Sequence, residues 1–480
     1  MEKDKDCNSL ATETTDEKTV QSHNKEKELL ASKSAPLTTL ESLEIASRTM
    51  SRQRTHHSID EEKNEKEIEV FRQQPYHTEG LRNPGWLAVI SCFLGTFVVY
   101  GIMYSWGNYQ KLYVEDIFAG RTDLFKIAFV GTSSSALSLA FGLFTTPVIQ
   151  KLGFRGTMMI GTILCPVSLI LASFATNLWE IYMTQGILAG IGGAFVFTPA
   201  ITLPSQWFTS RRGLATGLAI SGSGVGGVCF APLAQYLIDN LGYRDSLRVL
   251  GAISFTLLCI STALATSRYR PPLSNNGQGK WYHIVDFDLI NLRFILLFIY
   301  AFFAGFGYLA PFFLAPQYAQ HVGMSTSAGA AMISVMSATN AFARISLGYL
   351  ADKFGKLNAL LSCTFVGAIL TMVLWQFSSS PGSFITFSIL FGLTAGGFVS
   401  LLPVITGDIV GVENIQRGIG MIYLATVAGD LLGTPIVGLL RDAFDWTAAI
   451  QFAGSANMAA ALFLLALRMD IAYGHVFVKI

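Results

Sequence analysis

A series of apolar segments, each about 20 residues long, constrains this chain more than any other feature. A helix of about 20 apolar residues crosses the roughly 30 Å hydrocarbon core of a bilayer, where the backbone finds hydrogen-bond partners only within the helix itself. Twelve such segments occur after residue 84, at about 85–108, 127–149, 156–175, 178–203, 213–238, 245–266, 292–318, 325–350, 357–377, 382–406, 416–440 and 447–468. The sequence therefore predicts an all-α membrane protein with twelve transmembrane helices.

The composition supports a membrane protein and excludes several other classes. Hydrophobic residues make up 51% of the chain and charged residues 14%, against about a quarter charged in soluble proteins. The net charge of +1 gives no reason to expect nucleic acid as a partner. The six cysteines show no Cys-x-x-Cys spacing, so we expect neither a metal site nor a disulfide. No Walker loop, His-Glu-x-x-His pattern or nucleophile elbow is present, so we expect no cofactor and no enzyme.

Residues 1–82 differ sharply from the rest of the chain. They are rich in lysine and glutamate and nearly free of aromatic residues, and such a segment cannot bury enough apolar surface to offset the entropy of ordering. We therefore predict a disordered cytoplasmic tail. No apolar core follows the first charges, so no cleavable signal peptide is expected. Hydroxyl residues follow arginines between Arg48 and Ser58. This pattern suits kinase modification, but a merely solvated tail is the preferred interpretation.

A polar break divides the twelve segments into two sets of six. Residues 83–267 are predicted to form an N-terminal bundle, 268–291 a cytoplasmic linker, 292–470 a C-terminal bundle and 471–480 a cytoplasmic tail.

The two sets also repeat one another. Lys151-Leu-Gly153 matches Lys353-Phe-Gly355 at an offset of 202, and the pairs Gly192-Gly193 and Gly396-Gly397 each precede a proline by the same intervals. An offset this constant indicates a duplicated six-helix unit, with its copies related by an axis along the membrane normal. Such pseudo-symmetric halves enclose a central cavity that opens alternately to each side.

Basic residues predict the orientation, because lysine and arginine concentrate in cytoplasmic loops. They cluster in the even-numbered loops, at Lys151 with Arg155, Arg211 with Arg212, Arg268 with Arg270 and Lys280, Lys353 with Lys356, and Arg417. Both termini are therefore expected in the cytoplasm.

A glycine-spaced helix follows the arginine pair directly. Arg211 and Arg212 precede an apolar segment that carries Gly213, Gly217 and the glycine-rich stretch 222–227. Glycine allows neighbouring membrane helices to approach closely, so this segment is predicted to be a packing helix.

Several of these motifs resemble a known family. Gly348-Tyr-Leu-Ala-Asp-Lys-Phe-Gly-Lys356 is similar to the loop signature of the major facilitator superfamily, and Pro147-Val-Ile-Gln-Lys-Leu-Gly-Phe-Arg155 is its weaker counterpart. Trp207-Phe208 followed by Arg211-Arg212-Gly-Leu-Ala-Thr-Gly-Leu-Ala resembles the fifth-helix signature of the monocarboxylate transporters, and Ser400-Leu-Leu-Pro403 resembles their fungal branch. The likeness extends over about 84–470 and implies a transporter for a small organic solute.

The chain departs from that family at two places. The first helix opens with Asn83-Pro84-Gly85-Trp86, where family members usually carry an acidic motif. Proton-coupled animal members place Asp and Arg four residues apart in the eighth helix and Lys in the first. This chain has Asn340 and Arg344, and no lysine between Trp86 and Gln110.

Arg344 is the strongest candidate for solute binding. A guanidinium near the membrane centre costs from roughly 3 to more than 10 kcal/mol unless it faces a wet cavity or a partner. Its planar fork of donors suits a carboxylate. Alternatively, Arg344 extends to the cytoplasmic boundary near Asp352. Asn340 lies one turn earlier on the same face, where it either shares the ligand or holds the guanidinium.

Asp430 is the second candidate, because it lies inside the eleventh predicted span. It is either the charge partner of Arg344 or a proton carrier, and polar packing near Pro435 is the alternative. Tyr100, Tyr104, Trp106 and Asn108 in the first span and Gln185 in the fourth are further candidates for the cavity wall, or else packing residues.

Charged residues at the predicted cytoplasmic helix ends form a candidate gate. Arg211, Arg212, Asp352, Lys353 and Lys356 are expected either to fix the conformational states or only to set the topology.

The sequence as a whole predicts a secondary transporter that moves a small, monocarboxylate-like organic anion by alternating access. The alternatives are a carrier for another metabolite, such as a riboflavin-like vitamin or an exported product, and a non-transporting nutrient sensor on the same fold. The plasma membrane is the expected location, with the vacuolar membrane as the alternative.

Overall fold

The computed structural model describes residues 83–118, 120, 122, 124–209, 211–269, 289–412 and 414–472. These residues form helices and short connections, without a β-strand in the described ranges. The predicted N-terminal tail, most of the linker and residues 473–480 lie outside them.

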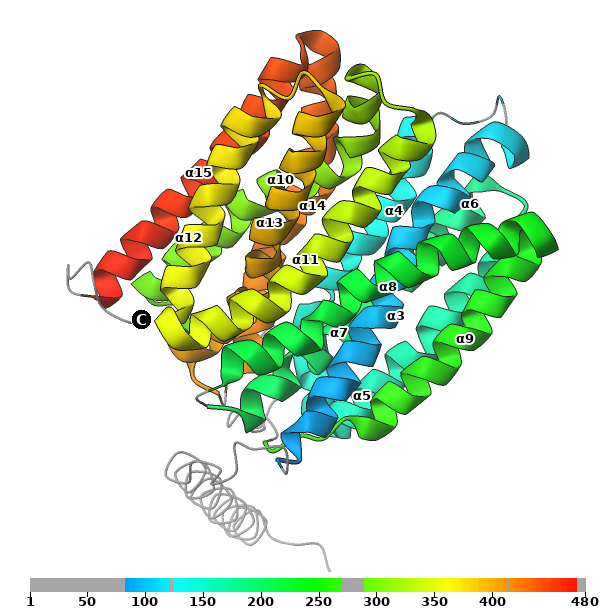
Figure 1. Ribbon diagram of the computed structural model, residues 1–480. Helices are drawn as coiled ribbons and strands as arrows, with labels where there is room; N and C mark the ends of the chain where they lie inside the picture. Colours follow the sequence, from blue (N-terminus) through cyan, green and yellow to red (C-terminus); the bar gives the residue numbers. More distant parts are fainter. Residues whose placement is uncertain are drawn as a thin grey trace, which may run out of the picture. The chain divides into compact units, whose positions relative to one another are not determined.

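The helices fall into two sets (Figure 1). The first set comprises α3 (Gly85–Leu112), η1 (Tyr113–Ile117), α4 (Leu124–Ala140), α5 (Gly142–Ala172), α6 (Leu178–Ile181), η2 (Tyr182–Leu188), α7 (Ala189–Trp207), α8 (Arg212–Leu241) and α9 (Tyr243–Leu264). The second set comprises α10 (Leu292–His321), α11 (Thr326–Phe354), α12 (Lys356–Ile369), η5 (Leu370–Trp375), α13 (Pro381–Val410), α14 (Ile415–Ala443) and α15 (Trp446–Ile471). The segments η1, η2 and η5 are π-helical turns continuous with their neighbours.

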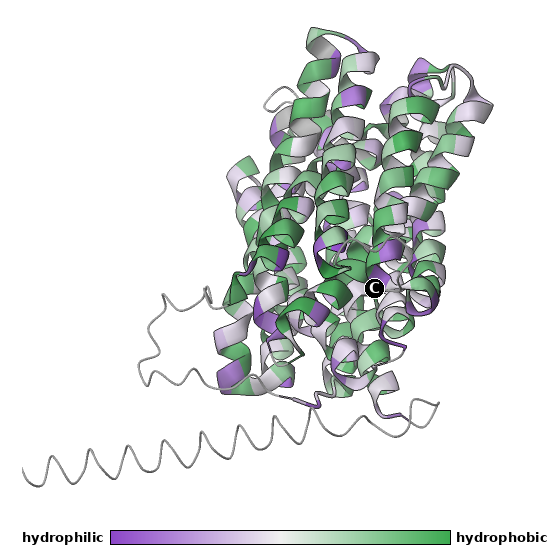
Figure 2. Ribbon diagram, turned by 90° about the vertical axis from the view of Figure 1, so that its left-hand side faces the viewer, coloured by the Kyte–Doolittle hydropathy of each residue, from purple (hydrophilic) through white to green (hydrophobic). Residues whose placement is uncertain are grey.

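Within the described residues, ten helices are long and apolar enough to cross a membrane. The two other spans expected from the sequence are α4 with the first turns of α5, and α11, whose 29 residues include Arg344, Asp352 and Lys353. Ten of the twelve transmembrane spans predicted from the sequence are therefore found among these helices. The other two spans stay a prediction. Hydrophobic residues cover the middle of the helices and hydrophilic residues gather toward their ends (Figure 2).

Two glycines divide consecutive spans at equivalent points of the two sets. Gly153 has φ 73° and Gly355 has φ 105°, a backbone region in which residues with a Cβ are strained. Gly153 interrupts α5 and so separates the second predicted span from the third, while Gly355 ends α11 before α12. The 202-residue offset between these glycines therefore corresponds to the same turn built twice.

Helix packing repeats in the same way. In the first set, α3 packs against α8, α5 against α7, and α5 against α9; in the second, α10 packs against α14, α12 against α13, and α12 against α15. These are equivalent pairs in the two sets. The predicted all-α fold with two pseudo-symmetric halves is confirmed, while six spans in each half stay a prediction.

The two halves meet mainly along α8 with α11 and along α14 with α4 and α5. At the α8–α11 crossing the backbones touch, because a Cβ at Gly217 would collide with the carbonyl oxygen of Arg344. Gly213 and Gly348 make a second such contact one turn away. The predicted role of the glycine-spaced helix in packing is thus seen at its boundary with the other half.

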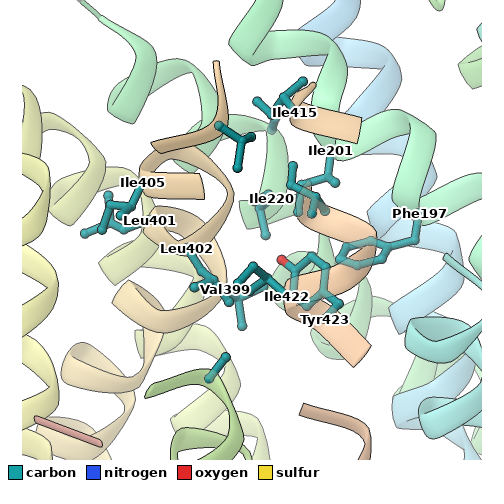
Figure 3. Packing of buried hydrophobic residues seen from close by; sticks show 14 of the residues in the cluster. Phe197, Ile201, Ile220, Val399, Leu401, Leu402, Ile405, Ile415, Ile422 and Tyr423 are labelled. Atoms are coloured by element: carbon teal, nitrogen blue, oxygen red, sulfur yellow. The ribbon is translucent and has the colours of Figure 1, made fainter. Parts of the chain in front are cut away.

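An apolar cluster continues across this boundary. It includes Phe197 and Ile201 of α7, Ile220 of α8, and Ile415 and Tyr423 of α14. Figure 3 shows the ring of Phe197 directed at that of Tyr423, with ring centroids 5.6 Å apart.

Candidate functional site

The guanidinium of Arg344 lies inside the helix bundle, at the boundary between the halves. Nη1 donates to the carbonyl oxygen of Ile220, at 2.9 Å, and to the hydroxyl of Ser223, both on α8. Nη2 donates to the hydroxyl of Tyr308 on α10, at 3.3 Å. The side chain of Arg344 therefore bonds to residues of both halves. It does not extend to the end of the bundle, so the alternative interpretation of the sequence is wrong for this conformation.

Three buried donors near Arg344 have no hydrogen-bond partner among the described residues. They are Nε of Arg344 itself, Nδ2 of Asn340 one turn earlier on α11, and the hydroxyl of Tyr423 on α14. Tyr423 lies close enough to Arg344 for an electrostatic interaction. Buried polar groups are nearly always paired, so unpaired ones that gather at one place point to a ligand or ordered water.

Aromatic side chains surround these donors. Tyr100 packs edge-on against Phe197, with ring centroids 5.3 Å apart, and lies 6.2 Å from Tyr104, one turn away on α3. In the second half, Tyr308 packs against Phe398 with ring centroids 5.3 Å apart. Helices α3, α7, α10, α13 and α14 thus give the Arg344 site aromatic walls that carry phenolic hydroxyls.

Asp430 lies two turns beyond Tyr423 on α14. Its residue surface is 7% exposed, and its carboxyl group forms no hydrogen bond or ion pair with any residue of the described ranges. The expected direct pair with Arg344 is therefore absent from this conformation. Asp430 nevertheless belongs to the same neighbourhood, because Tyr100 and Tyr104 both lie within electrostatic range of Asp430 and of Arg344.

Three candidates from the sequence, Asn108, Gln185 and Trp106, lie elsewhere. Asn108 donates from Nδ2 to the carbonyl oxygen of Ala231, at 2.7 Å, and so ties α3 to α8. Gln185 accepts a hydrogen bond of 3.3 Å from Tyr113 and lines a cavity of about 40 Å³ inside the first half, together with Trp106. The structure thus gathers Arg344, Asn340, Tyr100, Tyr104 and Asp430 at one place, without Asn108 or Gln185.

The predicted gate residues lie at one end of the bundle, where α8 begins and α11 ends; we call it the basic end. Nη1 of Arg212 is 2.7 Å from Oδ1 of Asp408, and Nζ of Lys356 is 2.7 Å from Oδ2 of the same carboxylate. Arg212 belongs to the first half, and Asp408 and Lys356 to the second. A single acid on α13 therefore joins the halves through an ion pair.

Asp352 makes a second link at the basic end. Its two carboxylate oxygens accept hydrogen bonds from the backbone N–H groups of Gly213 and Leu214, each 2.8 Å long. These N–H groups belong to the first turn of α8, where they have no acceptor within the helix. The helix dipole also favours a negative charge at this position. Arg211 and Lys353 are exposed at the same end.

Gln416 makes a third, fully buried link. Its Oε1 accepts from the hydroxyl of Thr202 on α7, at 2.8 Å, and its Nε2 donates to the hydroxyl of Thr145 on α5, at 2.9 Å. The side chain of α14 thereby joins two helices of the other half. In this conformation three separate polar links hold the basic end closed.

Sequence analysis missed Ser223, Tyr308, Tyr423, Asp408 and Gln416. Tyr308 lies in an apolar helix that contains many aromatic residues, so nothing local distinguishes it. Tyr423 is the sole aromatic residue of α14, but one tyrosine in an apolar span gives no indication of where its side chain points. Asp408 and Gln416 did carry a signal, since each is a polar residue near the end of a predicted span.

Comparisons with known proteins agree on one family. The model of the Major Facilitator Superfamily matches residues 85–380 and 334–474. The MFS-type transporter pynF of Aspergillus niger is 32% identical over 382 residues, which cover 78% of this chain and 86% of the relative. Monocarboxylate transporter 13 of Rattus norvegicus is 28% identical over 389 residues, covering 80% and 89%. Among solved structures, the Escherichia coli fucose:proton symporter FucP aligns with a TM-score of 0.60 and 13% identity, covering 79% of this chain and 98% of that chain.

Proposed function

Because the chain belongs to the Major Facilitator Superfamily and is a multi-pass secondary transporter, we propose that its solute is a small organic anion bound at Arg344. The anion would cross the membrane by alternating access between the two halves. The observation that carries this proposal is a buried guanidinium with neutral hydrogen-bond partners and one donor left over.

Electrostatics favours an anion over a neutral solute. A buried arginine is costly unless a negative charge or strong dipoles compensate it. The partners of Arg344 are a carbonyl oxygen and two hydroxyls, and no carboxylate of the described residues forms an ion pair with it. A visiting carboxylate would supply the missing charge and accept from Nε and from Asn340.

The relatives support the same solute class, since one of those reported above is named a monocarboxylate transporter. In this proposal Arg344 and Asn340 bind the anionic group, while Tyr100 and Asp430 contact the rest of the solute. Arg212, Asp352 and Lys356 close the basic end, which we place in the cytoplasm together with both termini. The plasma membrane is the proposed location, and kinase modification of the N-terminal tail a proposed means of regulation.

Replacing Arg344 tests the proposal in reconstituted vesicles. We expect Arg344→Gln to lower the uptake of labelled organic acids at least tenfold, because hydrogen bonds to charged groups contribute about 1.5–3 kcal/mol each. Arg344→Lys keeps the charge but loses the planar fork, so it should retain part of the flux. Arg248→Gln is the matched control, since Arg248 pairs with Asp245 on its own helix at 2.7 Å.

Undiminished flux in Arg344→Gln would remove Arg344 from the transport path. If the parent chain moved no organic acid, the solute class would be wrong. The alternative of a sensor on the same fold would then be tested by deleting residues 1–80, which should abolish signalling without changing the helix bundle.

A further inference from the structure

Four buried polar groups around the aromatic walls have no partner among the residues that the structure describes, and they differ in chemistry. Arg344, Asn340 and Tyr423 present unpaired donors, whereas Asp430 presents a buried carboxyl group to which no described residue donates a hydrogen bond. All four residues are more than nine-tenths buried, with exposed fractions of 2%, 3%, 4% and 7%. A single carboxylate would satisfy the donors and leave Asp430 without a partner.

The distance between the two kinds of group follows from α14. Tyr423 and Asp430 are seven residues apart, so they lie on one face of the helix about 10 Å from each other along its axis. Tyr423 packs against Phe197 in the apolar cluster that includes Ile220, whose carbonyl oxygen accepts from Arg344, and so it marks the end at which the anion binds. Asp430 marks the other end.

This spacing disfavours the shortest acids as ligands of both ends. If two hydrogen bonds of about 2.7 Å each are subtracted from the helix rise, a solute that reaches both Tyr423 and Asp430 needs polar atoms roughly 5 Å apart. A 2-hydroxy acid such as lactate carries its two polar groups on adjacent carbons and cannot reach both ends. A solute with a ring or chain between its polar groups can.

The residues between the two ends are aromatic. On α3, Tyr100 packs against Phe197, which in turn packs against Tyr423, and Tyr104 lies one turn away with its ring centroid 6.2 Å from that of Tyr100. Aromatic rings favour edge-on or offset contact with other rings. The walls therefore suit a flat, unsaturated body better than a polar one.

We propose that the solute is an organic acid with an aromatic or similarly apolar body and a hydrogen-bond donor, such as a hydroxyl group, at the end remote from its carboxylate. Arg344 and Asn340 bind the carboxylate, and Asp430 accepts from the remote donor. Asp430 is thereby the residue that determines specificity. This inference rests on the proposed function, because it takes Arg344 as the anion site.

Matched acids test the role of Asp430 through binding to the purified full chain, measured by calorimetry. The probes are 4-hydroxybenzoate, 4-methylbenzoate, which replaces the hydroxyl with a group of similar size, and lactate. We expect the parent chain to bind 4-hydroxybenzoate about fivefold more tightly than 4-methylbenzoate, as one hydrogen bond of about 1 kcal/mol to a buried carboxyl group predicts. Asp430→Leu should bind the two benzoates equally and keep the parent affinity for 4-methylbenzoate.

Two further variants keep the test falsifiable. Thr426→Val is the matched control, because Thr426 is buried one turn from Asp430 but donates to the carbonyl oxygen of Tyr423 in its own helix, at 2.8 Å. It should retain the preference. Asp430→Asn keeps an acceptor oxygen and should retain part of the preference for 4-hydroxybenzoate. This variant separates loss of the acceptor from loss of folding, and melting temperatures measured without ligand check that each variant is folded.

The outcomes separate this inference from the proposed function. Equal binding of both benzoates by the parent chain, or an undiminished preference in Asp430→Leu, would overturn the assignment of Asp430 and leave Arg344 as the anion site. If none of the three acids bound, both proposals would fail.

Discussion

Replacing Gln416 with leucine removes the buried amide that joins α14 to the other half. Leucine has a similar size and keeps the site filled, but it cannot bond to Thr145 or Thr202. We expect the closed basic end to become less favourable relative to an open one, since in an open state the amide would be hydrated and contribute nothing to closure.

The magnitude follows from the contacts. Two neutral hydrogen bonds are lost, each worth about 1 kcal/mol net. Neither threonine is left unsatisfied. Thr145 donates to the carbonyl oxygen of Gly142, at 2.6 Å, and the one hydroxyl hydrogen of Thr202, which no longer has Gln416 as an acceptor, turns to the carbonyl oxygen of Pro199, at 2.8 Å. The total of about 2 kcal/mol corresponds to a rise of roughly 30-fold in the ratio of open to closed molecules.

A reporter cysteine at Ile201 measures this ratio. Ile201 is fully buried in the apolar cluster at the boundary between the halves, near Ile415 in Figure 3. In a chain whose six native cysteines are replaced, Ile201→Cys should react with a water-soluble maleimide only after the basic end opens. When opening is fast and reversible, the labelling rate is proportional to the open fraction.

The matched control is Thr406→Val, which removes a buried hydrogen bond of 2.8 Å within α13, to the carbonyl oxygen of Leu402. Its labelling rate should equal that of the parent chain. Equal labelling rates in the parent and Gln416→Leu would refute the reasoning, because the amide would then contribute nothing to closure. Equal acceleration of labelling in Gln416→Leu and Thr406→Val would refute it too, since the loss of any buried hydrogen bond would then be enough to open the basic end.

Two further predictions concern α8. Asp352→Asn should speed labelling of the same reporter about tenfold, since it weakens a charge-assisted cap on two backbone N–H groups, whereas Lys353→Gln beside it should leave the rate unchanged. Gly217→Ala should lower the yield and melting temperature of the folded chain, because its Cβ collides with the backbone carbonyl of Arg344; Gly107→Ala, where a Cβ meets nothing within 4 Å, should leave both unchanged.

The fold was predictable because its determinants are local. A run of about 20 apolar residues implies a membrane helix wherever it occurs, and the positive φ of Gly153 and Gly355 could be anticipated from a repeated motif. The assignment of α11 as one of the membrane-spanning helices was less secure, because Arg344, Asp352 and Lys353 lower its hydrophobicity. The same polarity that weakens this helix as a predicted span is what drew attention to it as a functional element.

The site was predictable only in part, since sequence gives the depth of a residue in the membrane but not the direction in which it points. Arg344 stood out because a charge at that depth is costly. Asn108 and Gln185 lie at predicted spans too, yet their side chains face their own half. The partner of Arg212 is 196 residues away, at Asp408, and no local pattern connects them.

The contacts of Arg344 imply that solute binding and conformational change are linked. Nη1 bonds to Ile220 and Ser223 on α8, the helix whose first turn is held by Asp352 at the basic end. If α8 separates from α11, the guanidinium loses both partners while it is still deep in the bundle. An anion that replaces them lowers the free energy of the separated state more than that of the closed one, and only such a difference in affinity shifts a conformational equilibrium. We therefore expect an anionic solute to accelerate labelling of the Ile201→Cys reporter in the parent chain and not in Arg344→Gln.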